Sequence, residues 1–273
     1  TDYAYTVRFK YVPYTATYDF VYMLKDLTGD GYTEIDRESN VHGVLNSYVT
    51  PTVKAFDYAT LELAEGATIT EASGQELKVY YTRKNFQLSY ETNGGSYVAG
   101  ATVPYGTEQA VASTVPTKTG YTFAGWYLDE DLTQAADNTV TIESDTTLYA
   151  KWVGNTVNYT IVYMVEKYND AGTASSYVYG NSKTASGTVG TTVSASDSSV
   201  PALTGDYATA REKDTTKNAT SSVEIAADGS SVLFVYYKLT EYTFYFQPGT
   251  VTTGGGPGGG DSHNVTATLN GDT

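Results

Sequence analysis

The chain has 273 residues and a formal net charge of −15, from 31 acidic and 16 basic side chains. This balance excludes the basic face that nucleic acids and anionic membranes require, so neither is expected as a partner. The absence of cysteine excludes disulfides, thiolate catalysis and cysteine-ligated zinc. A content of 27 tyrosines, with many threonines and valines, favours strands and predicts a β-rich fold.

Residues 1–17 are expected to form one or two strands of a preceding unit or an N-terminal extension. Val7, Phe9 and Tyr11 share one face of an alternating run that Pro13 interrupts. Neither a secretory signal nor a run of about 18 apolar residues is visible, so no membrane-spanning helix is expected. We interpret the sequence as a segment of a longer protein whose signal peptide and anchor lie outside it.

Two segments of the chain repeat one another. Each contains, in order, a tyrosine-containing first strand, an Asp-Tyr-Ala-Thr segment and a closing strand with Val-Tyr-Tyr. The matched positions are 20–25 with 161–166, 57–60 with 206–209, and 77–81 with 233–237. Three anchors in the same order predict one module used twice, at residues 18–86 and 155–246. The second copy is longer, and we expect its insertions in loops at 171–182 and 213–222.

Corresponding residues of the two copies are expected to take the same structural roles. Tyr22 and Tyr163 should lie at equivalent places in the first strand. Asp57 and Asp206 should lie in turns or accept backbone N–H bonds, positions that aspartate favours. A short helix is expected before the turn of the first copy, at Pro51–Ala59.

The segment between the copies contains both tryptophans of the protein. It opens with Asn-Gly-Gly at 93–95, which favours positive φ and a tight turn. It continues with an aromatic run at 118–127 and closes with Leu-Tyr-Ala-Lys-Trp at 148–152. So many aromatic side chains in a short segment predict that Trp126 and Trp152 form its core.

The aromatic run reads Gly-Tyr-Thr-Phe-Ala-Gly-Trp-Tyr at 120–127. Regular alternation along a strand separates its side chains onto two faces. The predicted faces are Tyr121, Phe123 and Tyr127 on one side, and Ala124 and Trp126 on the other. A short helix is expected just before this run, at Ser113–Lys118.

This order of a Gly-Gly turn, a Gly-Tyr-Thr-Phe-x-Gly-Trp-Tyr strand and a closing Leu-Tyr-Ala-x-Trp resembles the InlB B-type repeat, also called the Listeria–Bacteroides repeat. The resemblance covers residues 87–154. It implies a small β-grasp-like module of bacterial surface proteins, without catalytic residues to transfer to this sequence.

The two flanking copies resemble MucBP-type repeats of mucin-binding surface proteins. The resemblance rests on the tyrosine-containing first strand, on Gly43 or Gly187, and on the closing Val-Tyr-Tyr. It implies a β-grasp-like arrangement here as well. Because the joints between the modules contain no long Gly/Ser linker, we expect a β-rich α+β fold of tandem small modules that form an elongated rod.

Residues 247–273 differ in composition from the rest of the chain. Their Gly-rich run at 254–260 cannot bury a core and predicts a flexible tail. The run lacks the Lys-Ser/Thr ending of a phosphate-binding loop, so no nucleotide site is predicted. Residues 261–273 are polar and are either a tail or the start of another domain.

The stretch Asp26–Glu34 places oxygen-bearing side chains at alternate positions, as calcium loops do. The bidentate carboxylate that such loops need at the twelfth position is replaced by Arg37. The equivalent stretch of the second copy, at 167–173, does not keep the oxygens. We therefore expect an Asp- and Gly-rich hairpin turn rather than a calcium site.

Other candidate residues lack the partners that their chemistry requires. His42 and His263 have no convergent ligands and no nucleophile elbow nearby in sequence, so neither is expected in a metal site or a catalytic triad. Lys78 stands where the other copy has Phe234 and is a candidate for a Lys–Asn isopeptide bond, but an exposed lysine on an amphipathic strand is expected. No catalytic, cofactor-binding or metal-binding residue is predicted.

The paired tyrosines Tyr80-Tyr81 and Tyr236-Tyr237 place one ring on each face of a strand. One ring of each pair is expected in the core and the other at the surface. Exposed tyrosines can stack on sugars or anchor contacts. Their recurrence at the same position of both copies favours cross-strand packing instead.

These features predict a non-catalytic repeat region of a bacterial cell-surface adhesin, extracellular and without a cofactor. It would project from the cell wall, or bind host or neighbouring-cell glycoprotein, mucin or another surface protein, as a monomeric segment of a longer chain. The alternative is a purely mechanical spacer, or an ancillary module of a larger surface enzyme. Exposed tyrosines gathered in one patch would favour binding, and tyrosines buried in sheets would favour the spacer.

Overall fold

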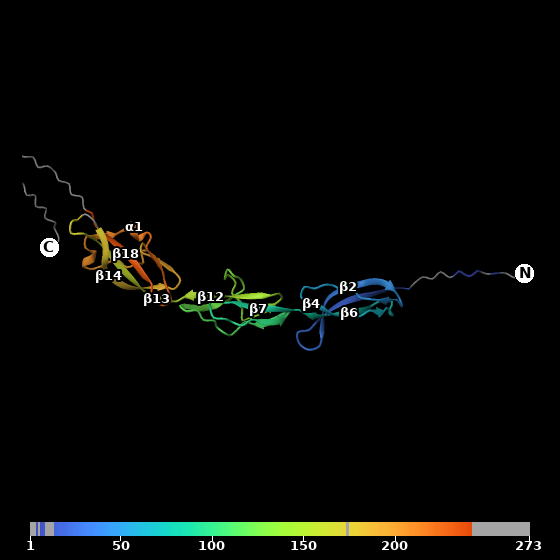
Figure 1. The fold of residues 1–273 in the computed structure, drawn as a ribbon. Helices are drawn as coiled ribbons and strands as arrows, with labels where there is room; N and C mark the ends of the chain where they lie inside the picture. The colour runs from blue at the N-terminus through green and yellow to red at the C-terminus, as the bar shows by residue number, and fades with distance from the viewer. Residues whose placement is uncertain (1–3, 5, 9–13, 173–174, 242–273) are drawn as a thin grey trace, which may run out of the picture.

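The computed structural model describes residues 4, 6–8, 14–172 and 175–241. These residues form a β-rich structure of tandem sheets, as the composition predicts, with two short helices (Figure 1). Of the predicted N-terminal strands, residues 15–17 open the first strand, and residues 6–8 have no regular structure. Residues 9–13 and the predicted tail at 247–273 lie outside the described residues.

The first unit contains a four-stranded sheet in the order β2-β1-β6-β4 and a two-stranded sheet of β3 and β5. Strand β1 pairs antiparallel with β2 and parallel with β6, and β6 pairs antiparallel with β4. The strands are β1 (Thr15–Lys25), β2 (Tyr32–Val44), β3 (Tyr48–Val49), β4 (Ala59–Ala64), β5 (Ala67–Thr68) and β6 (Gln75–Arg83).

The second unit is the central, tryptophan-containing segment. Its four-stranded sheet has the order β10-β12-β7-β8, and β9 pairs with β11 in a two-stranded sheet. Strand β7 pairs parallel with β12 and antiparallel with β8, and β12 pairs antiparallel with β10. The strands are β7 (Asn85–Glu91), β8 (Ala101–Pro104), β9 (Thr107–Ala110), β10 (Tyr121–Tyr127), β11 (Thr139–Ile142) and β12 (Thr146–Gly154).

The third unit contains a four-stranded sheet in the order β14-β13-β18-β16 and a two-stranded sheet of β15 and β17. Strand β13 pairs antiparallel with β14 and parallel with β18. The elements are β13 (Thr156–Tyr168), β14 (Ser175–Thr188), β15 (Thr192–Ser194), η1 (Asp206–Ala208), β16 (Arg211–Lys213), α1 (Thr215–Asn218), β17 (Ser222–Glu224) and β18 (Val232–Leu239).

All three units therefore share one strand order. In each, the first and last strands of the unit are the two central, parallel strands of the four-stranded sheet. The second strand flanks the first, and β4, β10 or β16 flanks the last. A parallel pair needs a long crossover, which the intervening strands of the unit supply. Each unit also buries its own hydrophobic cluster, so each has the core of a separate small domain.

The first and last strands of the two flanking copies correspond in register, as the sequence repeat indicates. Tyr22 of β1 is the register partner of Val79 in β6, and Tyr163 of β13 is the partner of Val235 in β18. Both tyrosines are buried and donate their hydroxyl to a loop carbonyl, at Thr52 or Pro201, over 3.1 and 2.7 Å. Corresponding tyrosines thus take the same role, as predicted.

The two Asp-Tyr-Ala-Thr segments do not take equivalent places, contrary to the prediction. Asp57 lies in a turn two residues before β4, which Ala59 and Thr60 open, whereas Asp206 opens the short helix η1 and β16 begins only at Arg211. An equivalent pair, in contrast, is Ile69 and Ile225, which are both fully buried and both exchange backbone hydrogen bonds with the turn after the second strand. The flanking copies are therefore one fold used twice.

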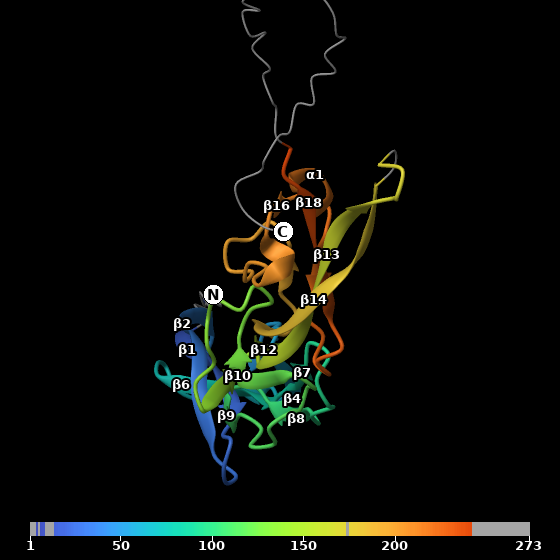
Figure 2. The same ribbon diagram turned by 90° about the vertical axis from the view of Figure 1, so that its left-hand side faces the viewer.

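The insertions of the second copy lie only partly where the sequence predicts them. Helix α1 occupies the predicted region 213–222. The other predicted loop, 171–182, is wrong in its C-terminal part, because β14 already begins at Ser175 and the extra residues lengthen the β13–β14 hairpin (Figure 2). Further extra residues lie at 191–200, in the loop that leads to Pro201.

Both helices predicted in the first two units are absent from these described segments. Residues 51–56 have no regular structure because Tyr81 occupies the backbone groups of Lys54: its hydroxyl donates to the Lys54 carbonyl and accepts from the Lys54 N–H, over 2.8 and 3.2 Å. Residues 113–117 likewise have no regular structure, since the carbonyl of Thr117 accepts from the N–H of Ser96 and its N–H donates to Oγ of Ser96. Tertiary hydrogen bonds override local helix propensity here.

The predicted faces of β10 are wrong because of a bulge. The pairing of β10 with β12 shifts register between Phe123 and Gly125, and Gly125 has φ +124°. One extra residue in a strand reverses the faces of the residues that follow it. Phe123 and Trp126 therefore share the core face, with ring centroids 5.2 Å apart. Trp126 is buried and Trp152 packs partly buried against the same cluster, as predicted.

Candidate functional site

Backbone and side-chain contacts join neighbouring units at single connecting residues. One residue, Lys84, separates β6 from β7 at the first joint. Its N–H donates to the carbonyl of Tyr58 in the first unit, over 2.9 Å, and its carbonyl accepts from the N–H of Tyr105 in the second unit, over 2.8 Å. The connecting residue is therefore bonded to both units and is not a free linker.

Side chains close the first joint further. The guanidinium of Arg83 donates through Nε to the carbonyl of Lys25 and through Nη1 to the carbonyl of Tyr105, both over 2.8 Å. The rings of Tyr58 and Tyr105 stack across the joint, with centroids 4.4 Å apart and an angle of 19° between their planes. Offset stacking of this kind adds to the apolar area that the contact buries.

The second joint follows the same scheme. Asn155 alone separates β12 from β13. Its N–H donates to the carbonyl of Gly120, over 2.8 Å, and its carbonyl accepts from the N–H of Val189, over 2.9 Å. Its side-chain oxygen also accepts from Oγ1 of Thr122, over 2.6 Å.

Two glycines allow the second and third units to approach closely. Gly120 has φ +80°, and a Cβ atom on it would lie 2.4 Å from Cβ of Ala227. Gly190 has φ +81°, and a Cβ atom on it would lie 2.4 Å from the hydroxyl of Tyr121. Only glycine satisfies both the positive φ and the short separation at these positions.

The joint scheme is general within the chain. In both joints the N–H of the connecting residue donates to the carbonyl of the residue just before β4 or β10 of its preceding unit. Its carbonyl accepts from the N–H of the residue just after the second strand of the next unit, β8 or β14. Half of the same scheme occurs at each outer end. The N–H of Leu45, after β2, donates to Tyr14, and the N–H of Thr240, after β18, donates to Ala210, before β16.

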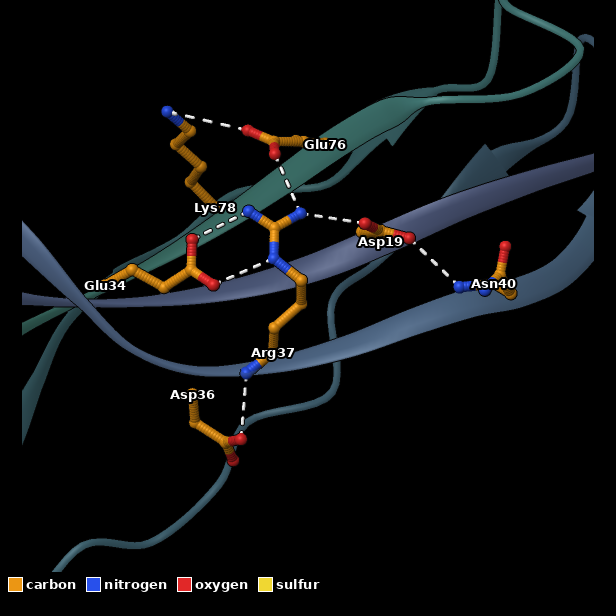
Figure 3. A network of polar contacts seen from close by, with 7 residues as sticks. All are labelled: Asp19, Glu34, Asp36, Arg37, Asn40, Glu76 and Lys78. Carbon is orange, nitrogen blue, oxygen red and sulfur yellow. Dashed lines mark hydrogen bonds and ion pairs between the residues drawn. The ribbon is translucent and has the colours of Figure 1, made fainter.

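A network of charges crosses the first sheet on the face opposite its core. Arg37 of β2 contacts Asp19 of β1, Glu34 of β2 and Glu76 of β6, each within 2.8 Å (Figure 3). Asp19 and Glu76 are direct register partners in the parallel pair. The guanidinium thus offsets the repulsion between two carboxylates that face one another.

The network shifts the protonation of its carboxylates. The N–H of Asn40, followed by the Arg37 guanidinium, holds the pKa of Asp19 below its usual value. Hydrogen bonds from Arg37 lower the pKa of Glu34 in the same way. These groups lie at the surface and are at most partly buried, so the network orders the surface of the sheet more than it adds stability.

A second surface feature occurs in both flanking units. Tyr32 and Tyr80 pack edge to face with centroids 4.8 Å apart, and the Tyr32 hydroxyl donates to Glu62 over 2.8 Å. This hydrogen bond raises the pKa of Tyr32. The cluster lines a surface hollow together with Leu63.

The third unit repeats this cluster at equivalent register positions. Tyr177 and Tyr236 pack edge to face with centroids 5.1 Å apart, and the Tyr177 hydroxyl donates to Asp214. Burial and then this hydrogen bond raise the pKa of Tyr177, and the same bond lowers the pKa of Asp214. Lys217 lies over both rings. We call these two sets the tyrosine–carboxylate clusters.

The turn at Asp26–Glu34 is a hairpin turn. Oδ1 of Asp26 accepts from Oγ1 of Thr33 over 2.6 Å, its N–H donates to the carbonyl of Gly31 over 2.9 Å, and Glu34 contacts Arg37. Within the described part of the chain, no group of three or more His, Asp or Glu residues is placed to hold a metal ion.

The remaining candidate residues are not brought together. His42 is exposed on the edge strand β2, while His263 and the Gly-rich run at 254–260 lie outside the described residues. Lys78 is exposed, as expected, and its Nζ lies 3.8 Å from Glu76. The joint residues are not among the sites that the sequence predicts, although the absence of a linker indicates their position.

The comparisons with known proteins identify a repeat domain in the central unit and relatives that are named as membrane proteins. Residues 86–151 match the model of the Listeria-Bacteroides repeat domain, which confirms the predicted B-type repeat of the central unit. Among the described residues, no helix is sufficiently long and apolar to cross a membrane.

Two relatives come from Evansella cellulosilytica. One, named "Putative Gly-rich membrane protein", is 36% identical over 100 residues, which are 36% of this chain and 10% of the relative. The other, named "Putative membrane protein", is 36% identical over 111 residues, which are 40% of this chain and 15% of the relative. The chain therefore spans only a small part of the curated relatives that it matches.

Proposed function

We propose that this chain is a non-catalytic segment of a bacterial cell-surface protein and acts as a stiff spacer. The observation that supports this most directly is the bonding of each connecting residue, Lys84 or Asn155, to both neighbouring units. The two backbone bonds of each connecting residue, with the side-chain contacts around them, restrict the reorientation of the units. A spacer of this kind would hold a distal part of the parent protein away from the cell wall.

The proposal treats each unit as a β-grasp-like module. The support is the strand order, in which parallel first and last strands lie at the centre of a mixed sheet. The flanking units would be MucBP-type repeats on the evidence of their sequence and of their shared tyrosine anchors. The units follow one another in a row in Figure 1, which supports an elongated rod.

The half-joints at Tyr14 and Thr240 support a tandem array that continues beyond the three units. A joint contains two backbone bonds, one with each neighbouring unit. At each outer end of the described structure, the bond with the unit that is present is already made. On this proposal, the units belong to a longer extracellular chain that lies at the cell surface or in the cell wall. The acidic composition would keep such a chain soluble and self-repelling.

Adhesion is a second candidate function. The tyrosine–carboxylate clusters recur on the outer face of both flanking units, where their rings could contact host or neighbouring-cell glycoprotein such as mucin. The test is binding of the chain to immobilised mucin with Tyr80→Ala and Tyr236→Ala together. Loss of binding supports adhesion, provided that the matched change Tyr97→Ala, at an exposed tyrosine of the central unit, leaves binding unchanged.

The spacer function is tested by small-angle X-ray scattering of the whole chain. The reference variant carries a short Gly/Ser insertion after Lys84, and the control carries the same insertion after Ser73, in an exposed turn inside the first unit. We expect the scattering curve of the joint insertion to be typical of flexibly linked units. The curve of the control should match that of the unaltered chain. A joint insertion without effect would argue against stiff joints.

A further inference from the structure

The two central strands of every unit are also the strands by which the chain enters and leaves that unit. In the first unit β1 and β6 run parallel, with Tyr18 opposite Gln75 at one end and Leu24 opposite Tyr81 at the other. Tension applied to the two ends of the unit therefore pulls β1 and β6 in opposite directions along their own length.

This geometry determines how force acts on the hydrogen bonds. When adjacent parallel strands slide past one another, all of the evenly spaced bonds between them are loaded at once. When strands are peeled apart from one end, the bonds are loaded one after another, and each breaks at low force. Forced unfolding is governed by the unfolding rate, so simultaneous loading makes a unit resist tension.

Tension also passes directly between units. The last strand of one unit continues through a single residue into the first strand of the next, at Lys84 between β6 and β7 and at Asn155 between β12 and β13. Because both strands of each joint belong to a central parallel pair, a pull along the chain reaches every unit in the same sliding direction.

We propose that the chain bears tensile load, and that the parallel pair of first and last strands is a mechanical clamp in each unit. This inference is independent of the spacer function. Flexibly joined units would still resist force, and a stiff row of units could still unfold readily, so the two ideas can fail separately.

The clamps differ in length, which sets the order of failure. The parallel pair has seven registered positions in the first unit, four in the central unit and six in the third. In the first unit Arg37 additionally contacts both strands of the clamp, through Asp19 and Glu76. The central unit should therefore unfold first under force.

The direct experiment pulls the first unit in two directions by single-molecule force spectroscopy. The chain contains no cysteine, so two introduced cysteines are unique attachment points. Tyr14→Cys with Lys84→Cys pulls along the clamp, and Tyr14→Cys with Ser73→Cys peels it from one end; all three positions are exposed. We expect a several-fold higher unfolding force along the clamp, and equal forces in both directions would overturn the proposal.

A second measurement tests the order of failure in the intact chain. Tyr14→Cys and Glu241→Cys serve as attachment points, and a Gly/Ser insertion after Ser73 lengthens the step that the first unit releases. The third unit is already longer, at 156–239 against 85–154 for the central unit. The first rupture should release the shortest length of chain, which belongs to the central unit. A first rupture that releases the lengthened first unit or the third unit would contradict the assignment of the clamps.

Discussion

Gly95 lies against the six-membered ring of the Trp152 indole. A Cβ atom at this position would lie 2.5 Å from Cζ2 of Trp152. The indole cannot move away freely, because its Nε1 donates to the carbonyl of Thr92 over 2.8 Å. Gly95 is thus required for close packing, while its neighbours Asn93 and Gly94 have positive φ values of 49° and 81°, as predicted for the tight turn.

We expect Gly95→Ala to lower the free energy of unfolding of the central unit by about 1–3 kcal/mol, the usual cost of overpacking. Both tryptophans lie in this unit, so tryptophan fluorescence during denaturant unfolding reports on it alone. Adding Trp152→Phe should recover part of the loss, since the smaller ring leaves room for the methyl group. An unchanged midpoint in Gly95→Ala would contradict the packing described.

Trp126→Ala should lower the free energy of unfolding of the same unit by about 3–5 kcal/mol, because it leaves a cavity in the core. Leu128→Ala is the matched control, since Leu128 is exposed just beyond the same strand; its effect should stay within about 0.5 kcal/mol. Fluorescence of the remaining Trp152 measures both variants. Equal effects of the two substitutions would show that Trp126 is not a core residue.

Tyr22→Phe and Tyr163→Phe should each lower the free energy of unfolding of their own unit by about 0.5–1.5 kcal/mol, because each leaves a loop carbonyl without its donor. Hydrogen exchange of the peptides that contain β1 and β13 measures each copy separately. Tyr97→Phe, at an exposed tyrosine, should change neither. A loss in one copy and none in the other would mean that the equivalent tyrosines differ in role.

Arg37→Met should destabilise the first unit in a manner that depends on pH. Asp19 and Glu34 have lowered pKa values in the folded protein, so their stabilising contribution is complete above their unfolded pKa values, near 4, and is lost as the pH falls through the folded values. The difference between the two proteins should therefore be largest at neutral pH and shrink in acid.

High salt should also reduce this difference, because it screens exposed charges. Thermal unfolding at several pH values and salt concentrations gives the measurement. Lys167→Met changes the net charge equally but lies in the third unit, and should show no such dependence in the first. A constant difference between pH 7 and pH 3 would show that Arg37 acts by packing and not by charge.

The sequence predicts the β-rich class, the equivalence of Tyr22 with Tyr163, and the burial of Trp126, because these depend on composition, repetition and size. It cannot predict the faces of β10, since the bulge at Gly125 is set by pairing with β12. Nor can it predict the absence of a helix around Lys54, where the hydroxyl of Tyr81, distant in sequence, bonds to the N–H and the carbonyl that a helix would use.

The joints show the same limit. Short connections at Lys84 and Asn155 are visible in the sequence, and they correctly indicate that the units adjoin. The bonding scheme of each joint is not visible, because its partners belong to loops of two different units. The roles of Gly120 and Gly190 become evident only where the backbones meet.

The central claim is that the joints are stiff, and distances between spin labels test it most directly. The cysteine-free chain allows one label pair per joint at exposed positions: Leu61→Cys with Leu128→Cys across Lys84, and Leu128→Cys with Val178→Cys across Asn155. The account predicts a single narrow distance distribution for each pair, which a Gly/Ser insertion at the joint broadens. Broad distributions in the chain without insertions would contradict it.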